Sequence, residues 1–129
     1  VRRLVDKIRK NADQLVRVET EALDGAEVVV VSYGITSRVA VPAIQKARDL
    51  GLRVGHLRLI IAWPFPEKLI RELAEKVNAF VVPEINYGQM VLEVERCAAG
   101  QAKTLLVPHG GGWVHDPEDI YQAIEEVAR

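Results

Sequence analysis

The chain has 129 residues, of which 49% are hydrophobic and 27% charged, and this is typical of one globular domain that needs no disulfide or metal to hold its core. The net charge is −1 and no basic run occurs, which argues against nucleic-acid binding. The longest apolar stretches have only the length of strands, which argues against a membrane span.

The start of the chain and its cysteine content indicate its setting. The single cysteine, Cys97, has no partner for an internal disulfide, and no secretory signal opens the chain, so we expect a soluble, cytoplasmic protein. The chain begins at Val1 and enters a helical pattern at once. We therefore expect residues 1–129 to be one domain cut from a longer polypeptide; processing, or a disordered start missing from the sequence, is the alternative.

The first third of the chain contains a helical pattern followed by two strand patterns. Apolar residues at helical spacing predict an amphipathic helix over residues 1–14. Alternation predicts a short, half-exposed strand over 16–21, and Asp24-Gly25 is typical of a turn. The β-branched run 28–31 is typical of a strand that is covered on both faces, as in a parallel sheet.

A helix and a second core strand are expected next. Thr36 or Ser37 can cap the helix, and Gly51 is typical of its end. Pro42 lies near the start of this helix, where it is tolerated in the first turn and otherwise produces a kink. Alternation over 53–61 predicts the strand.

The last half of the chain repeats the order helix then strand. Pro66 suits the first position of a helix, and an apolar stripe follows it. Residues 79–82 predict a strand, and Asn86 can cap a helix that has Cys97 on its apolar side. Residues 104–107 predict the last strand. Asp116, with Pro117 after it, is a strong signal for the start of the closing helix.

This order predicts an α/β fold with three layers, in which helices cover both faces of a mostly parallel sheet. We expect the core of the sheet to be formed by Val29, Val31, Val54, Leu57, Val81 and Leu106. In such sheets ligands and partners use the loops after the carboxyl ends of the strands. Here four such loops, 33–37, 62–66, 84–89 and 109–115, contain both tryptophans and two of the three histidines. We therefore expect a functional rim at this edge.

The familiar catalytic motifs are incomplete. A dinucleotide fingerprint needs three spaced glycines, and residues 33–38 contain only Gly34. The run Gly110–Gly112 could cradle a phosphate, but three residues separate it from the next helix cap, so a loop ordered by a partner is the better interpretation.

The remaining candidate groups are no stronger. His109 and His115 lack the further ligands of a zinc site, and Cys97 is expected to be a buried, inert thiol. Glu84 ends a strand and could act as an acid or base, although a local cap or pair is more usual. We predict no catalytic, cofactor-binding or metal-binding residue in this domain.

Several motifs in residues 28–90 resemble those of a known family. They are Tyr33-Gly34 after the first core strand, Gly51 before Arg53-Val54, Leu59 with Trp63-Pro64-Phe65-Pro66, and Pro83-Glu84-Ile85-Asn86-Tyr87-Gly88-Gln89. The chain resembles the C-terminal domain of transketolase-like, thiamin-diphosphate-dependent enzymes. Within that group it is most similar to the α subunit of 2-oxoacid:ferredoxin oxidoreductases. The resemblance runs from about Leu4 to Val127, and the loop 110–113 departs from it.

The resemblance implies a five-stranded, mostly parallel sheet with the strand near 16–21 antiparallel at its edge. It implies that the intact enzyme decarboxylates a 2-oxoacid on thiamin diphosphate with magnesium, and passes electrons through an iron–sulfur cluster to ferredoxin while forming an acyl-CoA. Other domains of that family hold the cofactor, and this domain forms subunit contacts. The expected interface residues are Tyr33, Gly34, Trp63, Glu84, Asn86, Tyr87, Gly88 and Gln89.

Two alternatives remain open from the sequence. The chain could be the equivalent domain of a transketolase, a deoxyxylulose-phosphate synthase or a pyruvate dehydrogenase β subunit. It could also be a free-standing α/β module that binds a small ligand or regulates another protein. The partners expected under the first interpretation are other subunits of the oxidoreductase and ferredoxin, with neither nucleic acid nor membrane.

Overall fold

The computed structural model describes residues 18–60, 65–83, 89–107 and 116–128, except for the side chains of Ile35 and Gln89. In chain order the elements are β1 (Val18–Glu21), β2 (Val28–Tyr33), α3 (Ile35–Asp49), β3 (Val54–Leu59), α4 (Glu67–Ala74), β4 (Ala79–Pro83), α5 (Gln89–Ala98), β5 (Lys103–Val107) and α6 (Pro117–Ala128). No helix in the described ranges is long and apolar enough to cross a membrane.

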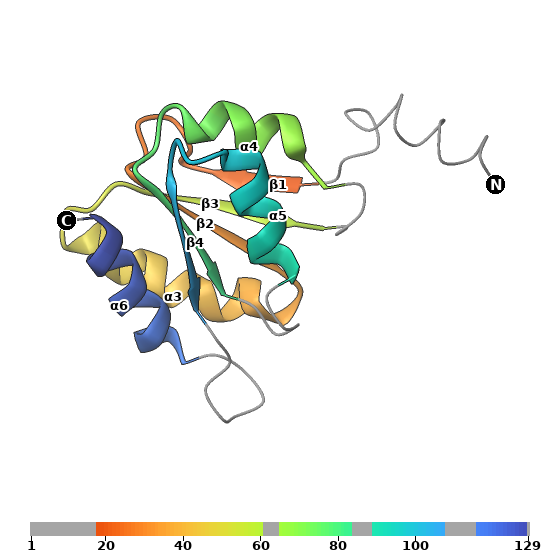
Figure 1. The fold of residues 1–129 in the computed structure, drawn as a ribbon. Helices are drawn as coiled ribbons and strands as arrows, with labels where there is room; N and C mark the ends of the chain where they lie inside the picture. Colours follow the sequence, from red (N-terminus) through yellow and green to blue (C-terminus); the bar gives the residue numbers. More distant parts are fainter. Residues whose placement is uncertain (1–17, 61–64, 84–88, 108–115, 129) are drawn as a thin grey trace, which may run out of the picture.

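The strands form one sheet in the order β1-β3-β2-β4-β5 (Figure 1). The pairs β3–β2, β2–β4 and β4–β5 are parallel, and β1 is antiparallel to β3 at one edge. The predicted mostly parallel sheet with one antiparallel edge strand is therefore confirmed. Because the parallel strands point the same way, the carboxyl ends of β2, β3, β4 and β5 lie at one edge, which we call the carboxyl rim.

Two separate hydrophobic clusters fill the two faces of the sheet. One cluster joins the sheet to α4 and α5, and includes Val29, Leu57 and Phe80. The other joins it to α3 and α6, and includes Val30 and Ile120. Figure 1 shows the two helix pairs on opposite sides of the sheet, as the predicted three layers require. Successive residues of β2 point to opposite faces, so its run of valines contributes to both clusters.

The predicted sheet core is correct at five of its six positions. Val29, Val31, Val54, Leu57 and Val81 are buried. The prediction was wrong for Leu106, whose side chain is 37% exposed. Leu106 lies in β5, an edge strand, where the face that carries Leu106 is only partly covered.

The start of α3 also differs from the prediction. The N-cap residue is Gly34, with φ of 64°, and not Thr36 or Ser37. The Thr36 hydroxyl instead donates to the carbonyl oxygen of Tyr33 at 2.8 Å and accepts from the Tyr33 amide at 3.2 Å. Pro42 consequently lies in the interior of the helix.

The predicted end of α3 is confirmed. Gly51 has a φ of 90°, its amide donates to the Arg48 carbonyl, and the Leu52 amide donates to the Ala47 carbonyl. This pair of hydrogen bonds is the Schellman arrangement, in which glycine tolerates the left-handed backbone. The predicted cap of α6 is also confirmed, because Asp116 Oδ1 accepts from the Glu118 amide at 2.9 Å.

Some sequence predictions fall outside the described residues. They are the helix over 1–14, the Asn86 cap and the loop 110–113, which departs from the family resemblance. The prediction for Cys97 lies inside them, and its side chain is buried in the α4–α5 cluster as expected. Burial raises the pKa of the Cys97 thiol, which agrees with an unreactive group.

Candidate functional site

Three of the predicted interface residues lie at the carboxyl rim within the described part of the chain. Tyr33 ends β2 and is 40% exposed, and Gly34 turns the chain into α3. Gln89 begins α5, although its side chain is not described. The other predicted interface residues, Trp63, Glu84, Asn86, Tyr87 and Gly88, lie outside the described residues.

One exposed apolar residue of the carboxyl rim was missed by the sequence reasoning. Ile60 follows β3 directly and is 44% exposed. Tyr33 pairs with Leu59 in the β2–β3 register, so Ile60 lies one residue beyond that pair. A signal was available, because Ile60 extends the apolar end of a strand without the alternation that precedes it.

A buried polar cluster lies on the α3 side of β2 and β3. The Ser32 hydroxyl lies 2.7 Å from Nε2 of His56 and 2.9 Å from the hydroxyl of Ser37. Each of the three side chains is at most 7% exposed. The hydrogen bonds satisfy hydroxyl groups that would otherwise be costly to bury. They also tie the end of β2 to the middle of β3 and the first turn of α3.

Sequence patterns do not indicate this cluster, because Ser32 and His56 are 24 positions apart. Each is a polar residue in a strand that is otherwise well buried. That pattern alone does not indicate that the two side chains face the same way. The pairing follows from the register, in which Ser32 aligns with Arg58 and His56 aligns with Val30.

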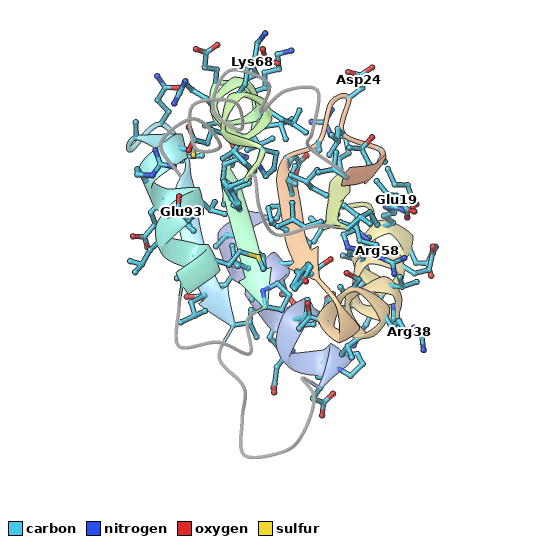
Figure 2. The ribbon with its side chains drawn as sticks, turned by 90° about the vertical axis from the view of Figure 1, so that its right-hand side faces the viewer. Glu19, Asp24, Arg38, Arg58, Lys68 and Glu93 are labelled. Atoms are coloured by element: carbon cyan, nitrogen blue, oxygen red, sulfur yellow. The ribbon has the colours of Figure 1, made fainter. Side chains whose placement is uncertain are left out.

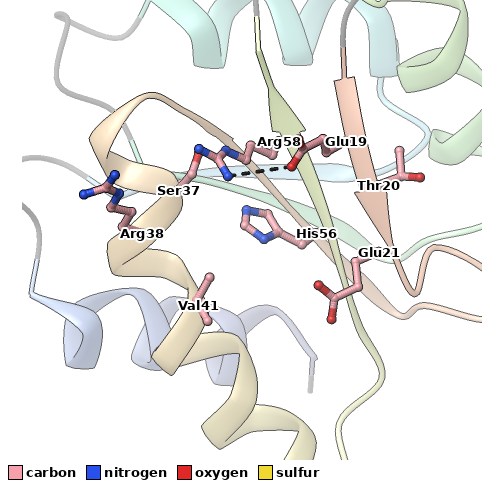
Figure 3. A pocket seen from close by; sticks show the side chains of 8 residues that line it. All are labelled: Glu19, Thr20, Glu21, Ser37, Arg38, Val41, His56 and Arg58. Carbon is pink, nitrogen blue, oxygen red and sulfur yellow. Dashed lines mark ion pairs between the residues drawn. The ribbon is translucent and has the colours of Figure 1, made fainter.

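A pocket of about 200 Å³ opens beside this cluster, between α3, β3 and β1 (Figure 3). It is lined by Glu19, Thr20, Glu21, Ser37, Arg38, Val41, His56 and Arg58. The antiparallel register places Glu19 opposite Arg58 and Glu21 opposite His56, which brings these four side chains to the same face of the sheet. Figure 2 shows Glu19 and Arg58 near each other at this edge of the molecule.

One ion pair connects the pocket lining to Arg48 behind it, and another joins two residues of the lining. Arg48 of α3 pairs with Glu21, and the same guanidinium donates two hydrogen bonds to the Val54 carbonyl at 2.9 and 2.7 Å. The hydrogen bond and the charge of Arg48 lower the pKa of the Glu21 carboxyl. Arg58 and Glu19 are 3.7 Å apart, too far for a good hydrogen bond.

Burial governs the protonation of His56. Loss of hydration lowers the pKa of the imidazole below its usual 6.5, the Glu21 carboxylate opposes this shift, and the charges of Arg48 and Arg58 add to it. The ring is therefore neutral at pH 7. A neutral ring has one donor and one acceptor nitrogen, and the structure assigns Nε2 to the hydrogen bond with Ser32.

The cluster does not have the geometry of a catalytic pair. Ser32 and His56 are within hydrogen-bonding distance, as a nucleophile and its base would be, but Ser32 is fully buried, so a reacting carbonyl has no approach to its hydroxyl. Nor do three His, Cys, Asp or Glu side chains come together as possible metal ligands anywhere in the described ranges. The site is suited to holding a small group by charge and hydrogen bonds.

Comparison with known proteins gives a family match over most of the chain. Residues 26–120 match the family described as pyruvate:ferredoxin oxidoreductase core domain II. The chain is 42% identical over 129 residues to the 2-oxoglutarate synthase subunit KorA of Methanothermobacter thermautotrophicus. The matched region covers 100% of this chain and 34% of that protein. The chain is also 41% identical over 125 residues to the ketoisovalerate oxidoreductase subunit VorB of the same organism, and this match covers 97% of the chain and 35% of VorB.

Solved structures share the fold. A 2-oxoglutarate:ferredoxin oxidoreductase from Magnetococcus marinus matches with a TM-score of 0.74 and 22% identity, over 94% of this chain and 21% of that one. A split-gene transketolase matches with a TM-score of 0.71 and 17% identity, over 85% of this chain and 41% of the transketolase chain. The predicted transketolase-like fold is confirmed. The chain spans about a third of the length of the curated relatives named above.

Proposed function

Because the chain belongs to the family of pyruvate:ferredoxin oxidoreductase core domain II, we propose that it is the subunit-interaction domain of a 2-oxoacid:ferredoxin oxidoreductase α subunit. The observation that carries the proposal is the family match over residues 26–120. In the proposed enzyme a 2-oxoacid is oxidatively decarboxylated to an acyl-CoA, and the electrons pass to ferredoxin. The two relatives are named for different 2-oxoacids, so the proposal stops at this substrate class.

The described residues do not fit thiamin diphosphate. The pocket of about 200 Å³ is smaller than the 300–1,000 Å³ usual for cofactor sites, and no group of possible metal ligands lies within the described part of the chain. We therefore assign thiamin diphosphate, magnesium, the iron–sulfur cluster and CoA to other parts of the proposed enzyme. The role left for this domain is contact and support.

The carboxyl rim is the proposed contact surface. Tyr33 and Ile60 present apolar side chains there, next to a sheet and helix that hold the backbone firmly. Tyrosine is favoured at interfaces because its ring is apolar while its hydroxyl can form a hydrogen bond. The proposed contact residues are Tyr33, Gly34, Ile60, Trp63, Glu84, Asn86, Tyr87, Gly88 and Gln89.

Matched variants can separate assembly from folding. Ile60→Ser removes an exposed apolar side chain at the carboxyl rim, and Leu50→Ser removes one that is 63% exposed just beyond the carboxyl end of α3, at the opposite edge. We expect Ile60→Ser to weaken subunit association about tenfold or more, equivalent to about 1.4 kcal/mol. Leu50→Ser should leave association unchanged.

The measurement is light scattering after size-exclusion chromatography of the assembled enzyme, over a hundredfold dilution series. Reduction of ferredoxin that depends on both a 2-oxoacid and CoA is measured on the same samples. Equal dissociation of the Ile60 and Leu50 variants would argue against the interface. An assembled enzyme without that ferredoxin reduction would argue against the activity itself.

A further inference from the structure

The pocket beside β1 contains hydrogen-bonding groups that the fold leaves unused. His56 is about nine-tenths buried and lines the pocket, yet only its Nε2 atom has a hydrogen-bond partner within the described residues. The second ring nitrogen, Nδ1, has none there. Among the described residues, the Arg58 guanidinium has Glu19 as its partner at 3.7 Å, which leaves donors of Arg58 available on that side.

The charges around the pocket favour an anion. Arg38 and Arg58 line it together with Glu19 and Glu21, and Arg48 neutralises Glu21 from behind. Three arginines against two glutamates leave one positive charge while His56 is neutral. Glu19 and Glu21 form an acidic wall on β1, which would repel a doubly charged ligand more strongly than a singly charged one.

The arrangement of the side chains suggests how such an anion would be held. Figure 3 shows the Arg58 guanidinium between Ser37 and Glu19, with His56 beneath it, while Arg38 points away from His56. A planar guanidinium binds a carboxylate through two parallel hydrogen bonds. Val41 adds an apolar wall on α3.

We propose that this pocket binds a small aliphatic monocarboxylate, with Arg58 holding the carboxylate and Val41 contacting the aliphatic part. The ligand carboxylate takes the Arg58 donors that the 3.7 Å contact with Glu19 does not engage, and the Nδ1–H form of His56 supplies a further donor. The volume of about 200 Å³ restricts the ligand to a few carbon atoms. This site lies between α3 and β1, neither Tyr33 nor Ile60 lines it, and the proposal does not depend on the proposed subunit contact.

Binding should alter the protonation of His56. A carboxylate near Nδ1 stabilises the charged ring, so the apparent pKa of His56 should rise when the ligand binds. The other charged groups near the ring are Glu21 from β1, Arg48 from α3 and Arg58 from β3, while Arg38 of α3 lines the pocket but points away from the ring. These groups are present both with and without the ligand, so a change in the pKa of His56 on binding reports the charge of the ligand.

The test is a titration of the 129-residue chain with sodium propionate, followed by NMR of the imidazole nitrogens and carbons. Sodium chloride at equal ionic strength and neutral propionamide are the controls. We expect His56 signals to shift with a saturable, millimolar curve for propionate alone. The His56 pKa should rise in saturating propionate, while the signals of His109 and His115 serve as internal references.

Variants identify the residue that holds the carboxylate. Arg58→Gln should weaken propionate binding at least fivefold, and Arg53→Gln, at an exposed arginine paired with Glu27 away from the pocket, should leave it unchanged. Arg58→Lys, which keeps the charge but loses the two parallel donors, should give an intermediate loss, and this keeps the test valid if Arg58→Gln folds poorly. A linear response to propionate, or equal binding by the Arg58 and Arg53 variants, overturns the proposal. Inorganic phosphate binding more tightly than propionate overturns the assignment to monocarboxylates.

Discussion

Apolar residues of the sheet differ in how much they contribute to the stability of the fold, according to how deeply their side chains are buried. Val29 is fully buried in the central strand β2, whereas Leu106 in β5 is 37% exposed. We expect Val29→Ala to lower the free energy of unfolding by about 1–4 kcal/mol, because it removes buried methyl groups and leaves a cavity. Leu106→Ala should cost less than about 1 kcal/mol. Urea denaturation of both variants measures the difference, and equal midpoints would contradict it.

His56 makes the stability of the fold depend on pH. The pKa of its imidazole is lowered in the folded state, so between that value and about 6.5 the unfolded chain binds more protons than the folded one. The stabilisation is therefore complete above pH 6.5 and is lost as the pH falls through the folded pKa.

The His56→Asn variant tests this dependence. Its free energy of unfolding should fall less between pH 7.5 and pH 5.5 than that of the wild type, as measured by urea denaturation at each pH. The Glu21 carboxyl, whose pKa is lowered by Arg48, should contribute only below its usual value of 4.5. An identical pH dependence in the two proteins would show that His56 is not responsible.

At the scale of elements, the side chain of Arg48 ties β1 to α3. Arg48 joins three elements, because it pairs with Glu21 of β1 and donates to the Val54 carbonyl of β3 from its place on α3. β1 has only four residues, three of them exposed, and pairs with a single neighbour. Such an element is expected to open locally at low free-energy cost.

Replacing this arginine should loosen β1 selectively. In Arg48→Met the amides of β1 should exchange with solvent severalfold faster, while those of β4, an interior strand on the other side of β2, keep their rates. Arg53→Met, which removes only the exposed pair with Glu27, is the matched control. Hydrogen exchange followed by NMR gives the rates. Uniform acceleration across the sheet would show instead that Arg48 supports the whole fold.

The sequence predicted most elements, because their signals are local. The valine run of β2, the Asp116 cap and the Gly51 helix end act within a few positions, and each of these predictions is confirmed. The errors have non-local causes. Leu106 was misplaced because the position of β5 at the edge depends on the strand order, and the cap of α3 was misplaced because Gly34 adopts a positive φ one turn early. The Ser32–His56 pair depends on register, which single-sequence patterns do not specify.

For the whole molecule we expect no turnover from the 129-residue chain alone. The described residues contain no accessible nucleophile with a base and no group of metal ligands. Purified chain supplied with thiamin diphosphate and magnesium should release no carbon dioxide from pyruvate or 2-oxoglutarate above a blank without protein. Calorimetry should show no saturable heat with thiamin diphosphate, NAD or CoA at micromolar concentration. A positive result in either assay would contradict the assignment of the chemistry to other parts of the enzyme.

The separation of the hydrophobic interior into two clusters has a consequence for how the protein tolerates change. Ile70 of α4 and Ile120 of α6 are both fully buried, but they lie on opposite faces of the sheet, in different clusters. Substitutions at the two sites should be additive within about 0.3–0.5 kcal/mol, because they share no neighbours. The α4–α5 face and the α3–α6 face can therefore diverge independently during evolution. A designer could likewise rebuild one face without repairing the other.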